Sequence, residues 1–232
     1  MLKIEKFVLM SPEQYQIVIE GMRNPKNSWN YIDSYAKYNS DLETPYTQFE
    51  FCMGDKDYKL CRDLAKGGSV HAKYRRMIPV WVTINAPLYW WKEFDTYKVG
   101  TVANSCSTMH KIQSKEFNFN DFSYDKLIVT HAECLDDCYD SMSILAETIK
   151  TLNHYRKLFL KSKDKKYWWQ MIQLLPTSYN QKRTVMLNYE VLANIYESRR
   201  NHKLDEWHVV CDWIETLPYN DLITGKFDNV EE

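Results

Sequence analysis

Two polar residues near the carboxyl end of the chain, Asn188 and Arg199, have a spacing that indicates a binding site. They lie in residues 182–201, where Leu192, Ile195 and further apolar residues recur at helical intervals and predict one helix. Eleven residues at about 100° each return to nearly the same face, so we expect Asn188 and Arg199 to share it. An arginine on such a face needs an acceptor, which is either a carboxylate from elsewhere in the fold or a bound ligand. The pattern leaves both possibilities open.

A basic segment with two glycines, GGSVHAKYRR at residues 67–76, offers a second candidate. Its glycines and cations suit an anion-binding turn, because backbone N–H groups in such turns can hold a phosphate. The spacing does not match a P-loop, and the residues favour a helix end followed by a basic strand edge. We interpret the charge run KSKDKK, residues 161–166, as a solvated turn rather than a phosphate site.

The segment HAECLDDC, residues 131–138, carries potential metal ligands. It lacks a fourth ligand at a zinc-like spacing, so we interpret it as a helix start with two acids near the positive end of the helix. We therefore predict no metal site. The six cysteines of the chain are dispersed, which favours reduced thiols in a cytoplasmic protein.

Local patterns predict the elements that must position these residues. Ser11, Pro12 and Gln14 form a helix N-terminus directly after a strand over residues 3–10, and Gly21 is the expected helix end. The further expected elements are a short helix at 28–38, a helix end at 61–68, a strand at 78–84, a short helix at 88–94, helices at 136–160 and 167–175, and a last helix at 205–216.

Strands early in the chain and long helices late in the chain indicate the α+β class. We predict one domain over residues 1–232, a length that can bury a large core. The formal net charge of -1 gives no field that would attract nucleic acid or an anionic membrane. No stretch approaches the length of a membrane span, and the N-terminus lacks the apolar run of a signal peptide.

Two segments together resemble the flavin-dependent thymidylate synthases, the thymidylate synthase complementing family. The first is APLYWWKEFDTYKVGTVANSCSTMH, residues 86–110. Here Lys92-Glu93-Phe94 falls at the family's Arg-Gln-Trp, and Thr96-Tyr97-Lys98 falls at its Arg-His-Arg. With one extra residue allowed, Asn104-Ser105 falls at Asn-Glu, and Ser107 falls at the serine of Ser-x-Arg-Tyr.

The second segment is LPTSYNQKRTVMLNYEVLANIYESR, residues 175–199. It is similar, without gaps, to the family's Leu-Pro followed by Asn-x-Arg-x-Leu and Asn-Phe-Leu-x-x-Arg. Asn188, Asn194 and Arg199 match this pattern, whereas Glu190 stands where the family has arginine.

The resemblance implies a central antiparallel sheet with long helices. It also implies a homotetramer that binds FAD at subunit interfaces and passes a one-carbon unit and a hydride to dUMP. Asn188, Asn194 and Arg199 would contact the cofactor, and Ser107 and Arg199 would take part in catalysis. The residues implied at the nucleotide substrate are Lys92, Glu93, Lys98, Asn104 and Ser107.

Three positions depart from the family pattern: Thr96, Met109 and Ile172 stand where the family has arginines that bind phosphate or activate the base. Each charge-assisted hydrogen bond that is lost costs about 1.5–3 kcal/mol. The replacements argue against ordinary dUMP methylation unless other cations compensate in a rearranged pocket. The candidate cations are Arg75, Arg76, Lys182 and Arg183.

Three hypotheses follow from the retained and lost residues. The chain is an enzyme variant that still binds flavin and a nucleotide, with dUMP methylation or a related reaction. Alternatively, it is an oligomer that binds or sequesters a nucleotide without catalysis, as a small phage-encoded protein would. A structural or regulatory oligomer with an empty pocket is the third hypothesis.

Overall fold

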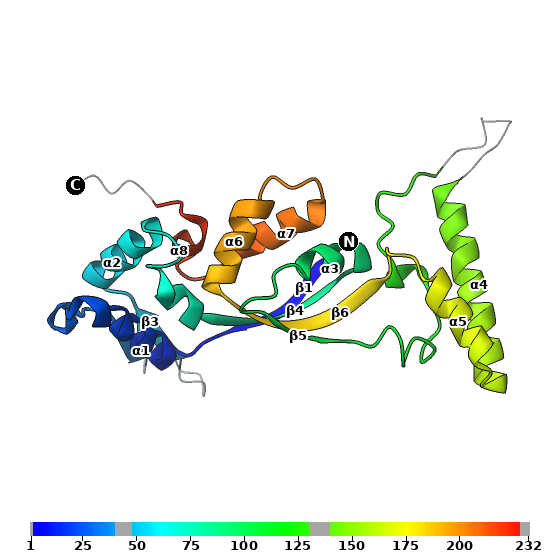
Figure 1. Cartoon of the computed structure of the whole chain (residues 1–232), viewed down its shortest axis with the longest axis horizontal. Helices are drawn as coiled ribbons and strands as arrows, with labels where there is room; N and C mark the ends of the chain where they lie inside the picture. The colour runs from blue at the N-terminus through cyan, green and yellow to red at the C-terminus, as the bar shows by residue number, and fades with distance from the viewer. Residues whose placement is uncertain (1, 40–47, 130–139, 228–232) are drawn as a thin grey trace. The chain divides into compact units, whose positions relative to one another are not determined.

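The computed structural model describes residues 2–39, 48–129 and 140–227, which form two compact units (Figure 1). The first unit comprises Met1–Glu5, Thr83–Thr96 and Ala103–Thr184, and the second comprises Lys6–Val82, Tyr97–Val102 and Val185–Glu232. Both units draw on one antiparallel four-stranded sheet, because every strand of it contributes residues to each unit. Its strands, in spatial order, are β1 (Lys3–Leu9), β4 (Pro79–Pro87), β6 (Asn180–Asn188) and β5 (Val102–Ser105). The α+β class is therefore confirmed.

The helices of the first unit surround an apolar core. Its elements are α3 (Leu88–Phe94), a 3-10 turn (Phe119–Asp121), α4 (Ser141–Ser162) and α5 (Lys165–Leu174). Figure 1 shows α4 and α5 side by side, and Leu152 of α4 and Met171 of α5 are both fully buried in this core. Asp140 caps α4 and Asp164 caps α5 through their side chains, so each helix begins at an aspartate. Of the charged run KSKDKK, residues 161–166, which was predicted as a turn, only Lys163 and Asp164 lie between the two helices, and its other residues belong to α4 and α5.

The second unit is mainly helical. Its elements are α1 (Pro12–Met22), 3-10 turns (Asn24–Lys26, Trp29–Tyr31 and Lys73–Met77), strands β2 (Tyr35–Asn39) and β3 (Gln48–Cys52), and helices α2 (Asp55–Lys66), α6 (Tyr189–Arg199), α7 (Asp205–Ile214) and α8 (Asp221–Thr224). Strands β2 and β3 pair antiparallel. Helix α6 lies against α7 and α8, and Leu192, Ile195 and Trp207 are fully buried between them.

Several local predictions are confirmed. Ser11 accepts a hydrogen bond from the Gln14 backbone while the Gln14 side chain accepts from the Ser11 backbone, which is the expected capping box of α1. Helix α2 ends at Lys66 with Gly67 as its C-cap, within the predicted helix end at 61–68, and α3 matches the predicted short helix at 88–94. The four cysteines in the described ranges, Cys52, Cys61, Cys106 and Cys211, form no disulfide.

Other predictions are wrong. Helix α1 continues through Gly21 and ends at Met22, and α8 follows the helix that was expected to be last. Of the short helix predicted at 28–38, only a 3-10 turn at Trp29–Tyr31 forms, and strand β2 begins at Tyr35. The segment HAECLDDC lies outside the described residues. In the part of the chain that is described, no helix is long and apolar enough to cross a bilayer.

Candidate functional site

The expected single helix over residues 182–201 is two elements, and the boundary between them lies at Asn188. Residues up to Asn188 belong to β6, in which Val185 and Leu187 alternate inward, and α6 begins at Tyr189. Asn188 therefore does not share a helix face with Arg199, and that prediction is wrong. Asn188 is the N-cap residue of α6: its Oδ1 accepts a hydrogen bond from the Val191 backbone N–H at 3.0 Å.

Tyr189 fixes the start of α6 in the second unit. Its backbone N–H donates to the Ile78 carbonyl at 3.0 Å, and its hydroxyl donates to the Pro218 carbonyl at 2.6 Å. Burial raises the pKa of the Tyr189 hydroxyl, so it remains a neutral donor. These two hydrogen bonds anchor the strand-to-helix junction next to Asn188.

A groove of about 420 Å³ opens at this junction. It is lined by Ser69, Arg76, Val99, Gly100, Asn188, Glu190, Val191 and Asn194. The N-terminus of α6 therefore faces a space that carries amide groups, a guanidinium and a carboxylate. This volume is within the range of small-molecule sites.

Gly100 brings the backbone of the first motif segment close to the second. Its φ of +79° is in the left-handed region, and a Cβ there would lie 3.0 Å from Asn188 Nδ2 and 3.2 Å from Val191 Cγ2. The position thus requires glycine for two reasons, conformation and space. No described residue accepts a hydrogen bond from Asn188 Nδ2, so this donor is available to a ligand in the groove.

Arg199 lies at the other end of α6, and its guanidinium contacts aromatic residues. Its Nε donates to the Tyr97 hydroxyl at 2.9 Å, and its guanidinium lies 4.9 Å from the centre of the Trp207 ring. Tyr97 belongs to the first motif segment, so the structure brings parts of both segments together within the second unit. Arg199 is half-buried, and Asn194, one turn away, is exposed in the groove.

Glu190 stands where the related motif has arginine, and the structure gives it a buried cationic partner. Arg75 Nε donates to Glu190 Oε2 at 2.8 Å, and Arg75 Nη1 donates to the Leu222 carbonyl at 3.0 Å. Both side chains are about nine-tenths buried. Arg75 is therefore committed to this pair, and Arg76 is the cation that lines the groove, where its Nη2 donates to the Ser69 carbonyl at 2.9 Å.

The remaining predicted site residues, apart from Lys98, belong to the first unit. Lys92 and Glu93 are on α3, Asn104 is exposed on β5, and Ser107 follows β5 in an exposed loop. The Ser107 hydroxyl accepts a hydrogen bond from the His110 backbone N–H at 2.9 Å, which stabilises the turn. Lys98 is an exposed residue of the second unit, beside the segment that lines the groove. The roles of these residues remain predictions.

The positions that lack arginine are occupied by side chains with local tasks. Thr96 Oγ1 donates to the Glu93 carbonyl at 2.8 Å. Ile172 packs against the apolar core of the first unit, and Met109 is 44% exposed. Two of the cations considered as substitutes are paired: Lys182 with Glu5 at 2.7 Å and Arg183 with Asp95 at 2.6 Å.

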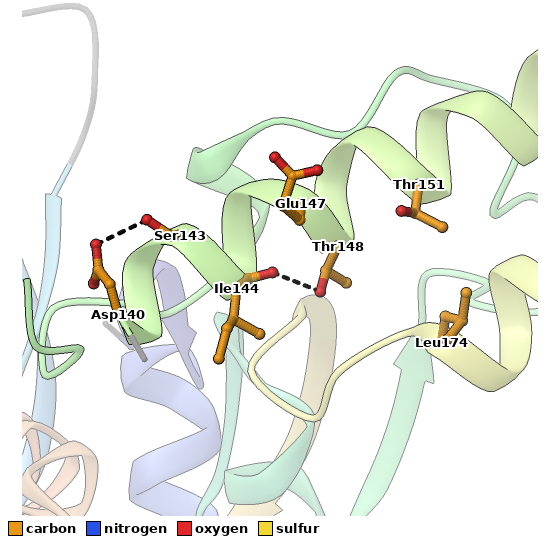
Figure 2. Close-up of a pocket in the computed structure, with 7 residues that line it drawn as sticks. All are labelled: Asp140, Ser143, Ile144, Glu147, Thr148, Thr151 and Leu174. Carbon is orange, nitrogen blue, oxygen red and sulfur yellow. Dashed lines mark hydrogen bonds between the residues drawn. The ribbon is translucent and has the colours of Figure 1, made fainter. Parts of the chain in front are cut away.

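A second hollow, of about 370 Å³, lies along α4 in the first unit (Figure 2). Ser143 Oγ donates to Asp140, and Thr148 Oγ1 donates to the Ile144 carbonyl, so these hydroxyls are used within the helix. Its charged lining residues, Asp140 and Glu147, are both acidic and would repel a phosphate. The α6 groove is therefore the better candidate site. Within the described ranges, no cluster of His, Cys, Asp and Glu could hold a metal ion.

Comparison with solved structures identifies the fold. The chain is similar to thymidylate synthase X (ThyX) from Helicobacter pylori, solved with FAD and dUMP, with a TM-score of 0.61 and 15% identity over 97% of both chains. It is also similar to the UMP/dUMP methylase PolB from Streptomyces cacaoi, solved with 5-Br UMP, with a TM-score of 0.55 and 14% identity over 93% of this chain and 87% of that chain. No protein-family model matches the chain, and no curated protein matches it by sequence. The chain therefore has the fold of the flavin-dependent thymidylate synthases, as the resemblance implied.

Sequence reasoning considered Arg75 and Arg76 as compensating cations, but it missed Gly100 and the pairing of Arg75 with Glu190. Asn188 followed by an acidic residue in the first turn of the helix, Glu190, is an N-cap signal. That signal would have placed the helix start correctly. The pairing of Arg75 with Glu190 has no local signal, because the two residues are 115 positions apart.

Proposed function

We propose that this chain binds a nucleotide, and FAD as a nucleotide-containing cofactor, in the groove at the start of α6. The observation that supports this most directly is the close approach of Gly100 to the Asn188 side chain in the lining of the groove, which we call the cradle. A Cβ at position 100 would take up space next to the Asn188 amide donor. Arg76 supplies a cation for a phosphate group at the same groove. ThyX and PolB, which share the fold, are described as binding dUMP or a uridine nucleotide analogue.

The residues fit one end of a flavin dinucleotide. Asn188 Nδ2 and Asn194 offer amide groups to the edge of a ring or sugar, and Arg76 and the α6 N-terminus favour a phosphate. Reduced flavin, when bound, would supply a hydride to an electron-poor carbon. The Arg199 guanidinium, which lies over the Trp207 ring and donates to Tyr97, would then hold these two aromatic side chains in place next to α6 rather than bind a phosphate directly.

We infer that the protein acts as an oligomer, with the groove completed at a subunit interface. Val99 lines the groove and is 91% exposed, which is unusual for an apolar side chain beside a polar site. A partner subunit that covered Val99 would remove this apolar surface from water. The homotetramer that the resemblance implies is the assembly we propose.

Ordinary dUMP methylation is the less supported activity, because Thr96, Met109 and Ile172 cannot supply guanidinium groups to a phosphate. We therefore keep the enzyme variant and the non-catalytic nucleotide-sequestering oligomer, a role that would suit a phage-encoded protein, as two candidate functions. The retained residues Asn188, Asn194 and Arg199 favour nucleotide binding under both candidate functions.

Spectroscopy of the purified oligomer separates the two candidates. A flavoprotein would be yellow and show the visible absorbance bands of flavin, and it would transfer a methyl group to a uridine nucleotide when supplied with methylenetetrahydrofolate and NADPH. A sequestering protein would release a nucleotide on heat denaturation, as detected by mass spectrometry. Absence of both flavin and nucleotide, before and after reconstitution, would contradict the proposal.

The placement of Arg199 in the site is tested by Arg199→Ala, with Tyr97→Phe as the matched control. We expect Arg199→Ala to weaken ligand binding about tenfold, because the loss of the guanidinium also releases Tyr97 and Trp207. Tyr97→Phe removes only the hydroxyl and should have a smaller effect. Unchanged affinity of Arg199→Ala for every ligand tested by calorimetry would remove Arg199 from the site.

A further inference from the structure

Glu190 is a buried carboxylate that lines two adjoining grooves. One is the groove at the start of α6, and the other is a hollow of about 770 Å³ that also reaches α8. The two hollows share Ser69, Glu190 and Asn194 in their linings, so they meet at these residues. A ligand in either hollow can therefore reach Glu190.

The two oxygens of Glu190 have different surroundings. Oε2 accepts the hydrogen bond from Arg75 Nε at 2.8 Å. Oε1 accepts no hydrogen bond from the described residues, and it is not among the polar atoms that are sealed from solvent without a partner. A carboxylate has about four lone-pair sites, so Glu190 retains acceptor capacity that a donor on a ligand would use.

Arg75 makes this arrangement compatible with an anionic ligand. The guanidinium balances the Glu190 charge and is itself held by the Leu222 carbonyl at 3.0 Å. The groove at the start of α6 then keeps one uncompensated cation among its lining residues, Arg76. A phosphate is favoured near Arg76 and disfavoured near Glu190, where hydroxyl donors are favoured instead.

We propose that Glu190 selects the sugar of the ligand by accepting hydrogen bonds from the vicinal hydroxyls of a ribose. This inference rests on the proposed nucleotide-binding function and makes it more specific, because it assigns a ribonucleotide rather than a deoxyribonucleotide to the groove. Carboxylates recognise ribose hydroxyls in dinucleotide-binding folds for the same chemical reason. The ribose belongs either to a ribonucleotide substrate or to the adenosine half of FAD.

The test compares ligand pairs that differ in this sugar, measured by calorimetry on the intact oligomer. We expect UMP to bind the unaltered protein about tenfold more tightly than dUMP, or FAD to bind about tenfold more tightly than deoxy-FAD, the FAD analogue whose adenosine carries 2′-deoxyribose. In Glu190→Gln the preference should fall to nearly one for the pair concerned. The pair that loses its preference identifies the source of the ribose.

A second variant guards against simple misfolding. Glu190→Gln leaves Arg75 buried without a charged partner, so the double variant Glu190→Gln with Arg75→Gln, which keeps two polar side chains of similar size, is measured beside it. The inference is supported if both variants lose the ribose preference while their thermal midpoints and their affinity for dUMP or deoxy-FAD are retained. Equal weakening of both members of each pair overturns the inference. It is also overturned if the unaltered protein binds UMP no more tightly than dUMP and FAD no more tightly than deoxy-FAD.

Failure of the proposed function gives a different result. If the unaltered protein binds none of the four ligands, the nucleotide-binding function and this inference are both wrong. If it binds them without discriminating between the sugars, only the role of Glu190 is wrong.

Discussion

The α6 segment and the positions 96, 109 and 172 belong to motifs that resemble one family, yet their side chains have different tasks. Around α6, Asn188, Gly100 and Arg76 surround a groove. At the other positions, Thr96 stabilises a turn and Ile172 belongs to a core. The fold is therefore kept while positions that carry arginine in the related motifs are occupied by side chains with ordinary structural roles.

The largest expected effect comes from breaking the buried pair beside the groove. Arg75→Ala leaves the Glu190 carboxylate buried and uncompensated, so we expect the free energy of unfolding to fall by about 3–5 kcal/mol. Urea denaturation followed by circular dichroism measures this. Lys150→Ala, which removes an exposed pair with Glu147, is the control and should have little effect. Equal stability of the two variants would show that the Arg75–Glu190 pair does not hold the wall of the groove.

Substitution can restore arginine at two of the replaced positions, 172 and 109. Ile172→Arg places a charge against the apolar core of the first unit and should cost about 2 kcal/mol or more of stability.

Met109→Arg introduces the same side chain at a position that is 44% exposed, so it should fold normally. If the missing guanidinium is what limits phosphate binding, Met109→Arg should also raise dUMP affinity about tenfold. No gain in calorimetry would show that the loss of arginine is not the limiting difference.

Gly100→Ala tests the cradle. Because alanine is strained in the left-handed backbone conformation of position 100, the free energy of unfolding should fall by about 1–2 kcal/mol. The new methyl group should also displace the Asn188 amide and weaken nucleotide binding. Gly68→Ala is a matched control, because Gly68 has a φ of +87° but a Cβ there would meet no atom within 4 Å. If both variants lose similar stability and only Gly100→Ala loses nucleotide binding, the steric role of Gly100 is confirmed. Equal binding by both variants would contradict it.

The smallest expected effect separates the two roles of Asn188. Asn188→Ala removes the helix cap and should cost about 1 kcal/mol of stability. Asn188→Asp keeps a capping oxygen but replaces the amide donor with an acceptor, so stability should be retained while nucleotide affinity falls. Thermal denaturation and calorimetry on both variants measure the two effects. If Asn188→Asp bound the nucleotide as tightly as the unaltered protein, Asn188 would act only as the helix cap, through its Oδ1.

The sequence indicated more of the fold than of the site. Caps are short-range features, so Ser11, Pro12 and Gln14 were sufficient to place the start of α1. The boundary between β6 and α6 was missed because Leu192 and Ile195 do lie on one helical face, and that period was extended back through residues that alternate as a strand. Val185 and Leu187 are buried with a period of two, which was the available signal.

The sequence by itself determined the α+β class, most helix positions and the residues Asn188, Asn194 and Arg199 as members of one motif. Only the tertiary structure decided that Gly100 contacts Asn188, that Tyr97 holds Arg199, and that Arg75 neutralises Glu190. The physical reason is the range of the interactions. Caps and periodicity act within a few residues, whereas a groove is formed by side chains that are distant in sequence and meet only after the chain has folded.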